Sequence, residues 1–304
     1  MSDTDQITYG RRERLRLALA DQAADIADSA RGMVTTYADG YVNAGEFVEM
    51  ACRIAADARE LLSLAVVYER RRGTSWEVVG ETLGISRQAA HERYASIEKQ
   101  VDTDVTECWL LGDDPRFPGL PEAASDPGAG AVRLDRWVSD RMVSTDPLAH
   151  KDPADPARTH PVSGQLAPLS TLEHSSLVTA AAVLLSERRR RYGLGGTRTR
   201  ELELGFARRK VQLYERMIAD ETGEPGRSGT PVDDLRALLT GARARLAELT
   251  QAAVVSCVCA PGRCSRGEFR DHQGDSPGCM ACADLDPEQP CYAAVDQPGP
   301  GGKG

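Results

Sequence analysis

The chain has 304 residues and a formal net charge of −9, and aromatic residues make up only 5% of it. Proteins that coat nucleic acid through charge alone are usually basic, so this balance argues against non-specific binding by the whole chain. The N-terminal residues lack the apolar core of a signal peptide, and the longest apolar run is too short to span a bilayer. We therefore expect a cytoplasmic protein with no membrane partner, whose cysteines are reduced unless they bind metal.

Helical periodicity dominates the first third of the chain. Apolar residues recur at helical spacing over residues 10–37 and again over residues 47–68, which is the clearest amphipathic pattern present. Asn43 and Glu46 have the spacing of a capping box for the second of these helices. Three arginines and a glycine follow it, a typical helix end, because cations stabilise the negative end of the helix dipole.

Residues 74–97 carry the most informative pattern, two short helices joined by a tight turn. Thr74 and Glu77 are spaced as a capping box for the first helix. Gly84 occupies the turn, where a left-handed backbone costs glycine least, and Ser86 can cap the second helix. The small Gly80 would allow the two helices to approach closely. The residues expected to face inward are Val78, Val79, Leu83, Ile85, Ala89, Ala90 and Tyr94.

This stretch resembles a known family. The matching residues are Gly84, Ile85, Ser86, Arg87, Ala89, Ala90, Arg93 and Tyr94, and their pattern is similar to the helix-turn-helix of sigma-factor region 4 and related bacterial DNA-binding domains. Trp76 and Ala90 differ from the commoner residues at their positions. The resemblance covers residues 74–97 only, and it implies a bihelical unit whose second helix enters the major groove of DNA.

We therefore predict a sequence-specific DNA-binding protein, a bacterial transcriptional regulator that reads DNA with the helix from Ser86 to about Glu98. The residues predicted to contact DNA are Ser86, Arg87, Gln88, His91, Glu92, Arg93 and Lys99. Arg87 and Gln88 can each bond a base edge through two hydrogen bonds, whereas Arg93 and Lys99 suit phosphates. Nearby glutamates nearly cancel the arginines, so we expect modest affinity from one copy and help from a homodimer or a partner.

Residues 111–170 have a different composition. Nine of the 17 prolines lie here, mixed with Asp, Gly, Ala and Ser, which predicts a flexible linker. One short amphipathic piece, residues 132–143 with Trp137, could dock on another element. Helical patterns return over residues 171–255 and predict a bundle or an antiparallel coiled coil, which is also a candidate surface for a protein partner.

Six of the eight cysteines fall in residues 256–293. Paired thiolates across a turn-rich segment suit a zinc site, and a segment with so little apolar content needs a metal or a crosslink to be ordered. The preferred zinc ligands are Cys259, Cys264, Cys279 and Cys282, with Cys257, His272 and Cys291 as substitutes or as a second site. Redox-active thiols or an unstructured thiol-rich tail remain alternatives.

The predicted organisation is all-α. A helical domain over residues 10–110 contains the helix-turn-helix, and residues 1–9 and 294–304 are expected to be disordered tails. The chain has no phosphate-binding loop, nucleophile elbow or zinc-protease motif, so we do not expect an enzyme. The alternative function is a protein-interaction adaptor, in which the helix-turn-helix is structural and the cysteine-rich end binds zinc or senses redox state.

Overall fold

The computed structural model describes residues 9–34, 36, 39–113, 117–143, 145–192, 197–223 and 229–255. Regular structure in these residues is helical, apart from an isolated bridge between Tyr9 and Pro168. This confirms the all-α prediction. The chain divides into two compact units, residues 1–174 and 175–304. Among the described helices, none combines the length and the apolar character that crossing a membrane requires.

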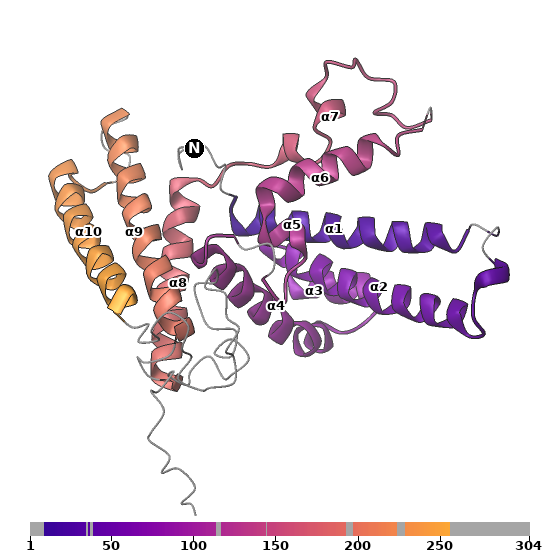
Figure 1. The fold of residues 1–304 in the computed structure, drawn as a ribbon, viewed down its shortest axis with the longest axis horizontal. Coiled ribbons are helices and arrows are strands. Elements are labelled where there is room, and N and C mark those ends of the chain that lie inside the picture. The colour runs from indigo at the N-terminus through magenta and orange to yellow at the C-terminus, as the bar shows by residue number, and fades with distance from the viewer. Residues whose placement is uncertain are drawn as a thin grey trace, which may run out of the picture. The chain divides into compact units, whose positions relative to one another are not determined.

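The first unit begins with a helical hairpin of α1 (Arg11–Gly32) and α2 (Glu46–Arg71), which run side by side (Figure 1). A single 3₁₀ turn, η1 (Asp39–Tyr41), lies in the connection. The predicted capping box of α2 is wrong, because α2 begins at Glu46 and its N-cap is Gly45, with no side-chain cap. The Glu46 carboxylate instead accepts from the Asn43 backbone amide at 2.9 Å and from the Asn43 side chain at 3.2 Å.

The hairpin packs against α4 (Arg87–Leu110), which follows the short α3 (Trp76–Leu83). Leu15 of α1, Val67 of α2, and Val101 and Val105 of α4 form one buried cluster. These residues come from three helices that are distant in the chain, and their burial removes apolar surface from water. The last turns of α4 are therefore part of the core of the first unit.

The structure overturns the linker prediction for residues 117–143. They contain α5 (Glu122–Ser125) and α6 (Pro127–Ser139), and both helices pack on α1. Pro127 occupies the first turn of α6, where the missing N–H is not needed. The buried cluster consists of Leu17 and Ala24 of α1 with Ala123, Ala131 and Leu134. Small side chains at this contact allow the helices to approach closely. The linker prediction rested on the number of prolines, which gives no information about such packing.

Trp137 docks on α1, as its amphipathic segment suggested. Its indole N–H donates to Asp28 at 2.8 Å, and Arg141 pairs with the same carboxylate at 2.7 Å while lying over the Trp137 ring. The hydrogen bond from Trp137, followed by that from Arg141, lowers the pKa of Asp28. The remaining part of the predicted linker has little regular structure, limited to α7 (Pro156–Thr159) and η2 (Ser163–Gln165). Asp135 holds this part by accepting from the amides of residues 162 and 163.

Helix α8 (Thr171–Tyr192) starts in the first unit and continues into the second. There, α9 (Thr197–Gly223) and α10 (Val232–Val255) lie side by side (Figure 1). Arg243 of α10 pairs with Glu215 of α9 at 2.8 Å, and Leu213 and Leu235 are buried. The helices predicted over residues 171–255 are therefore present as α8, α9 and α10. The cysteine-rich segment and both predicted tails, except Tyr9, lie outside the described residues.

Gly130→Ala should destabilise the protein, because the new Cβ would lie 2.4 Å from Ala123 Cα and 2.6 Å from Ala123 Cβ. Overpacking of this kind costs about 1–3 kcal/mol, which exceeds the gain of up to about 1 kcal/mol in helix propensity. Urea unfolding followed by tryptophan fluorescence measures the difference. Gly128→Ala in the same helix is the control, because its Cβ would meet only Asp126 Oδ1 at 3.8 Å. Equal stability of the two variants would contradict the packing of α6 on α5.

Candidate nucleic-acid interface

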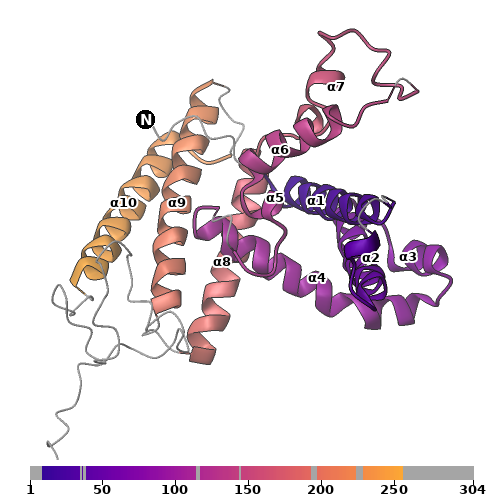
Figure 2. The same cartoon turned by 45° about the vertical axis from the view of Figure 1, so that its right-hand side comes forward.

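The helix-turn-helix comprises α3, the turn at residues 84–86 and the first turns of α4 (Figure 2). Gly84 has φ +67°, the left-handed backbone that the sequence predicted. Gly80 lies directly against the turn: a Cβ there would come within 2.8 Å of the Ile85 carbonyl oxygen and 3.1 Å of the Arg87 amide nitrogen. Only a residue without a side chain allows this approach, so Gly80 sets the distance between α3 and the start of α4.

The two helices are capped by serines. Ser86 accepts from the Ala89 amide at 3.1 Å, as predicted, and so fixes the first turn of α4. At α3 the cap is Ser75, which accepts from the Val78 amide at 3.3 Å. The predicted capping box of Thr74 and Glu77 is therefore wrong by one residue. The Thr74 hydroxyl instead donates to Glu69 at 2.8 Å, and this hydrogen bond is the main cause of the lowered pKa of Glu69.

One face of the motif is buried against α2. Val79 of α3, and Ala90 and Tyr94 of α4, form a cluster with Val66, and Trp76, Leu83 and Ile85 pack around it. Val78 was also predicted to face inward, but its side chain is 48% exposed. Neighbouring positions on a helix point about 100° apart, so α3, with Val79 buried against Val66, leaves Val78 at the margin of that contact.

The opposite face of α4 is open. All seven residues predicted to contact DNA are exposed: Ser86, Arg87, Gln88, His91, Glu92, Arg93 and Lys99. Gln88 Nε2 donates to Glu92 at 2.8 Å, and His91 stands edge-on to Trp76 with 5.5 Å between ring centroids. The side chains of Arg87, Gln88, His91 and Glu92 are therefore together on the first two turns of α4. Lys99 follows Ser86 by about 20 Å along the helix axis and is separate from this group.

Ion pairs divide the cationic residues near the motif into two groups. Arg70 lies 3.7 Å from Glu98 and over the Trp76 ring, and Arg71 pairs with Glu98 and Asp102. These contacts join the end of α2 to α4. Arg87, Arg93 and Lys99 form no ion pair with any residue that the structure describes. Arg72 pairs with Glu69 at 2.8 Å. Three of the cationic residues near the motif therefore have carboxylate partners, and Arg87, Arg93 and Lys99 are the ones left to meet a phosphate.

The predicted zinc ligands Cys259, Cys264, Cys279 and Cys282, and the substitutes Cys257, His272 and Cys291, lie outside the described residues. Within the residues that are described, no three His, Cys, Asp or Glu side chains are grouped to hold a metal ion. Two cysteines are described, the exposed Cys52 and the buried Cys108, whose Sγ lies 3.5 Å from the Ser125 carbonyl oxygen. The zinc site remains a prediction from the sequence.

Comparison of the chain with protein-family models, with curated proteins and with solved structures finds no match. A function must therefore be argued from the chemistry of the described residues. The exposed start of α4, which is capped by Ser86 and buried on its opposite face, is the feature most relevant to function.

Ser86→Ala should lower the free energy of unfolding by about 0.5–2 kcal/mol, because the Ala89 amide loses its acceptor at the start of α4. Ser96→Ala is the matched control, since Ser96 is exposed in the interior of the same helix, where alanine is the better helix former. Urea unfolding monitored by far-UV circular dichroism compares the two. A Ser86→Ala variant as stable as Ser96→Ala would show that this cap does not hold α4.

Proposed function

We propose that the chain binds DNA sequence-specifically through the first two turns of α4 and acts as a bacterial transcriptional regulator. The observation that carries the proposal is the division of α4 into two faces. Ala90 and Tyr94 are buried against α3 and α2, while Arg87, Gln88 and His91 are exposed on the same turns. A rigidly held helix with exposed polar side chains at its start has the geometry that base reading in the major groove requires.

The exposed side chains suit different bases. Arg87 can donate two hydrogen bonds to guanine, and Glu92 can accept from the amino group of cytosine. Gln88 already donates one hydrogen to Glu92, but its amide retains a second hydrogen and the carbonyl oxygen. These two groups are the ones that pair with adenine. The hydrogen bond to Glu92 therefore orients the Gln88 amide without exhausting it.

Phosphate contacts would be few. The free amides at the start of α4 favour an anion, and Arg93 and Lys99 supply positive charge further along the helix. Exposed Glu77 and Glu81 on α3 oppose this attraction. Neutralisation of about three phosphates per copy gives a slope of roughly −3 in the logarithm of affinity against the logarithm of salt. A homodimer would double the slope, and we propose that two copies bind together.

The remaining parts of the proposal follow from this role. A DNA partner places the protein in the cytoplasm, and no catalytic role is assigned to it. The helices after residue 171 would contact a protein partner, and the cysteine-rich end would bind zinc. The second candidate function is a protein-interaction adaptor, favoured by the exposed Glu77, Glu81 and Glu92 around few unpaired cations, a balance that would also suit a basic protein surface.

Selection from random duplex DNA with the purified full-length protein should enrich a defined sequence. Fluorescence anisotropy on that sequence should then show that Arg87→Ala plus Gln88→Ala weakens binding at least about thirtyfold, because two base contacts of about 1–3 kcal/mol each are lost. Arg53→Ala plus Gln251→Ala is the matched control. Both of these residues are exposed and outside α3 and α4, and the change in charge is the same, so binding should persist.

Two results would favour the adaptor. The first is failure of the selection to enrich any sequence at low salt. The second is enrichment of a sequence that the Arg87 and Gln88 double variant binds as well as the wild type, since the bases would then be read elsewhere. Thermal unfolding of both double variants shows whether each remains folded.

A further inference from the structure

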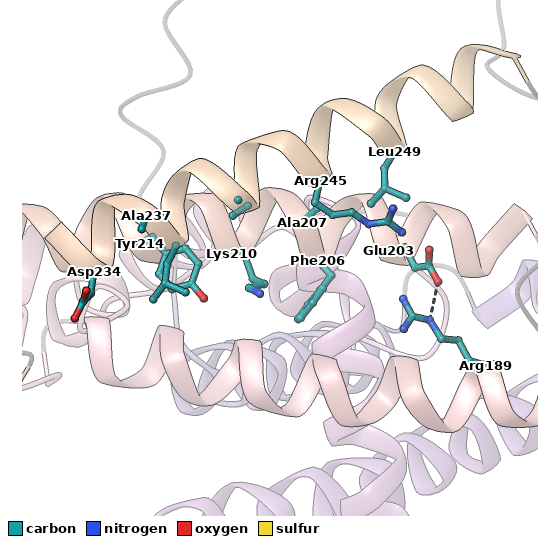
Figure 3. A pocket seen from close by; sticks show the side chains of 13 residues that line it. Arg189, Glu203, Phe206, Ala207, Lys210, Tyr214, Asp234, Ala237, Arg245 and Leu249 are labelled. Atoms are coloured by element: carbon teal, nitrogen blue, oxygen red, sulfur yellow. Dashed lines mark hydrogen bonds and ion pairs between the residues drawn. The ribbon is translucent and has the colours of Figure 1, made fainter. Parts of the chain in front are cut away.

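The second unit contains a half-open cavity of about 660 Å³ between α9 and α10, with Arg189 of α8 at its edge (Figure 3). We call it the α9–α10 groove. Its volume lies within the range of about 300–1,000 Å³ that is typical of small-molecule sites. It shares no residue with the helix-turn-helix, so its role is independent of the proposed DNA binding.

The walls of the groove are mainly apolar. Phe206 and Ala207 come from α9, and Leu238, Ala242 and Leu249 come from α10. Gly241 of α10 also lines the groove, and a Cβ built there would have no other atom within 4 Å. An apolar slot of this kind can hold the body of a flat organic molecule, because burial of such a molecule removes apolar surface from water.

Lys210 places a positive charge between these apolar walls. The Lys210 ammonium lies 5.8 Å from the Phe206 ring centroid and 5.7 Å from that of Tyr214. It is partly buried and forms no ion pair among the residues that the structure describes. A partly desolvated ammonium without a carboxylate partner costs free energy unless an anion reaches it. Lys210 therefore favours a ligand that carries a negative charge.

The other charges in the groove leave Lys210 unneutralised. Glu203 is paired with Arg189 at 2.8 Å, and Arg245, among the residues that the structure describes, is paired with the exposed Glu248 three residues away. Pairs of that kind contribute little and can exchange partners. Asp234 lies near Tyr214, at the end of the groove opposite Leu249 and Arg245 (Figure 3). The centre of the groove therefore combines apolar walls with positive charge.

We propose that the α9–α10 groove binds a small amphipathic organic acid, with a planar apolar body and one anionic group. The apolar body packs on Phe206, Leu238 and Leu249, and the anionic group pairs with Lys210. A neutral molecule of the same shape gains the apolar contacts but leaves Lys210 unpaired, so it binds more weakly.

Two fluorescent probes of closely similar shape test the proposal on the full-length protein. They are 1-anilinonaphthalene-8-sulfonate and N-phenyl-1-naphthylamine, which lacks the sulfonate. We expect saturable binding of one sulfonate probe per chain, about tenfold tighter than the neutral probe, as a charge-assisted contact predicts. Lys210→Met keeps the apolar stem and removes the charge, so the sulfonate probe should lose this tenfold preference while the neutral probe binds as before.

Gly241→Leu fills the groove and should abolish binding of both probes. The matched controls are Lys151→Met, an exposed lysine outside the groove and outside the helix-turn-helix, and Gly223→Leu, at the end of α9 where a Cβ also meets no atom within 4 Å. Both controls should bind the probes as the wild type does, and circular dichroism and thermal unfolding verify that every variant is folded.

Three outcomes would overturn the proposal. One is equal affinity for the two probes, with no response to Lys210→Met. Another is binding of several probe molecules per chain that persists in Gly241→Leu, which indicates general apolar surface. The third is absence of probe binding together with a dimer that Gly241→Leu dissociates, because the groove would then be an interface between two copies of the chain. Probe binding does not depend on the proposed DNA binding, so a failure of that proposal would leave these measurements unchanged.

Discussion

The burial of the second half of α4 determines where the candidate site lies. Val101 and Val105 pack against Leu15 of α1 and Val67 of α2, and Trp109 is fully buried near the end of the helix. Because α4 is one continuous helix of 24 residues, this packing also fixes the direction of its first turns. The exposed residues at its start are therefore presented by the core of the unit, and no flexible loop is involved.

Two close backbone contacts complete that frame. Gly80 brings α3 against the turn before α4, and Gly130 brings α6 against α5. In both places a methyl group would overlap a neighbour, so packing requires glycine there despite its cost to a helix. Gly241 of α10 is a different case. It faces open space, and the absent side chain leaves room in the α9–α10 groove.

Charge is distributed in the first unit mainly for structure. Arg14 is completely buried, pairs with Asp113 at 2.8 Å and donates to the backbone carbonyls of residues 9 and 124. Arg133 and the amide of residue 123 both contact Asp21. With Arg70 and Arg71 also held by carboxylates, many arginines join one helix to another. In the first unit these arginines therefore serve packing between helices.

The sequence alone determined the features that arise within a few residues. The left-handed Gly84, the cap at Ser86, the buried Ala90 and Tyr94 and the helical periods follow from local backbone preference and 3.6-residue spacing, and the structure agrees with each. The sequence could not decide between two neighbouring capping residues. Thr74 and Ser75 both suit an N-cap, and Ser75 takes that position because the Thr74 hydroxyl bonds to Glu69.

Tertiary structure decided the features that depend on distant partners. Residues 117–143 have prolines and few large apolar side chains, so they appear unable to bury a core until α1 supplies the other surface for Ala123 and Ala131. The α9–α10 groove likewise requires side chains from two different helices, α9 and α10. The physical reason is the same in both cases: local preference acts along the backbone, whereas burial depends on which surfaces meet in space.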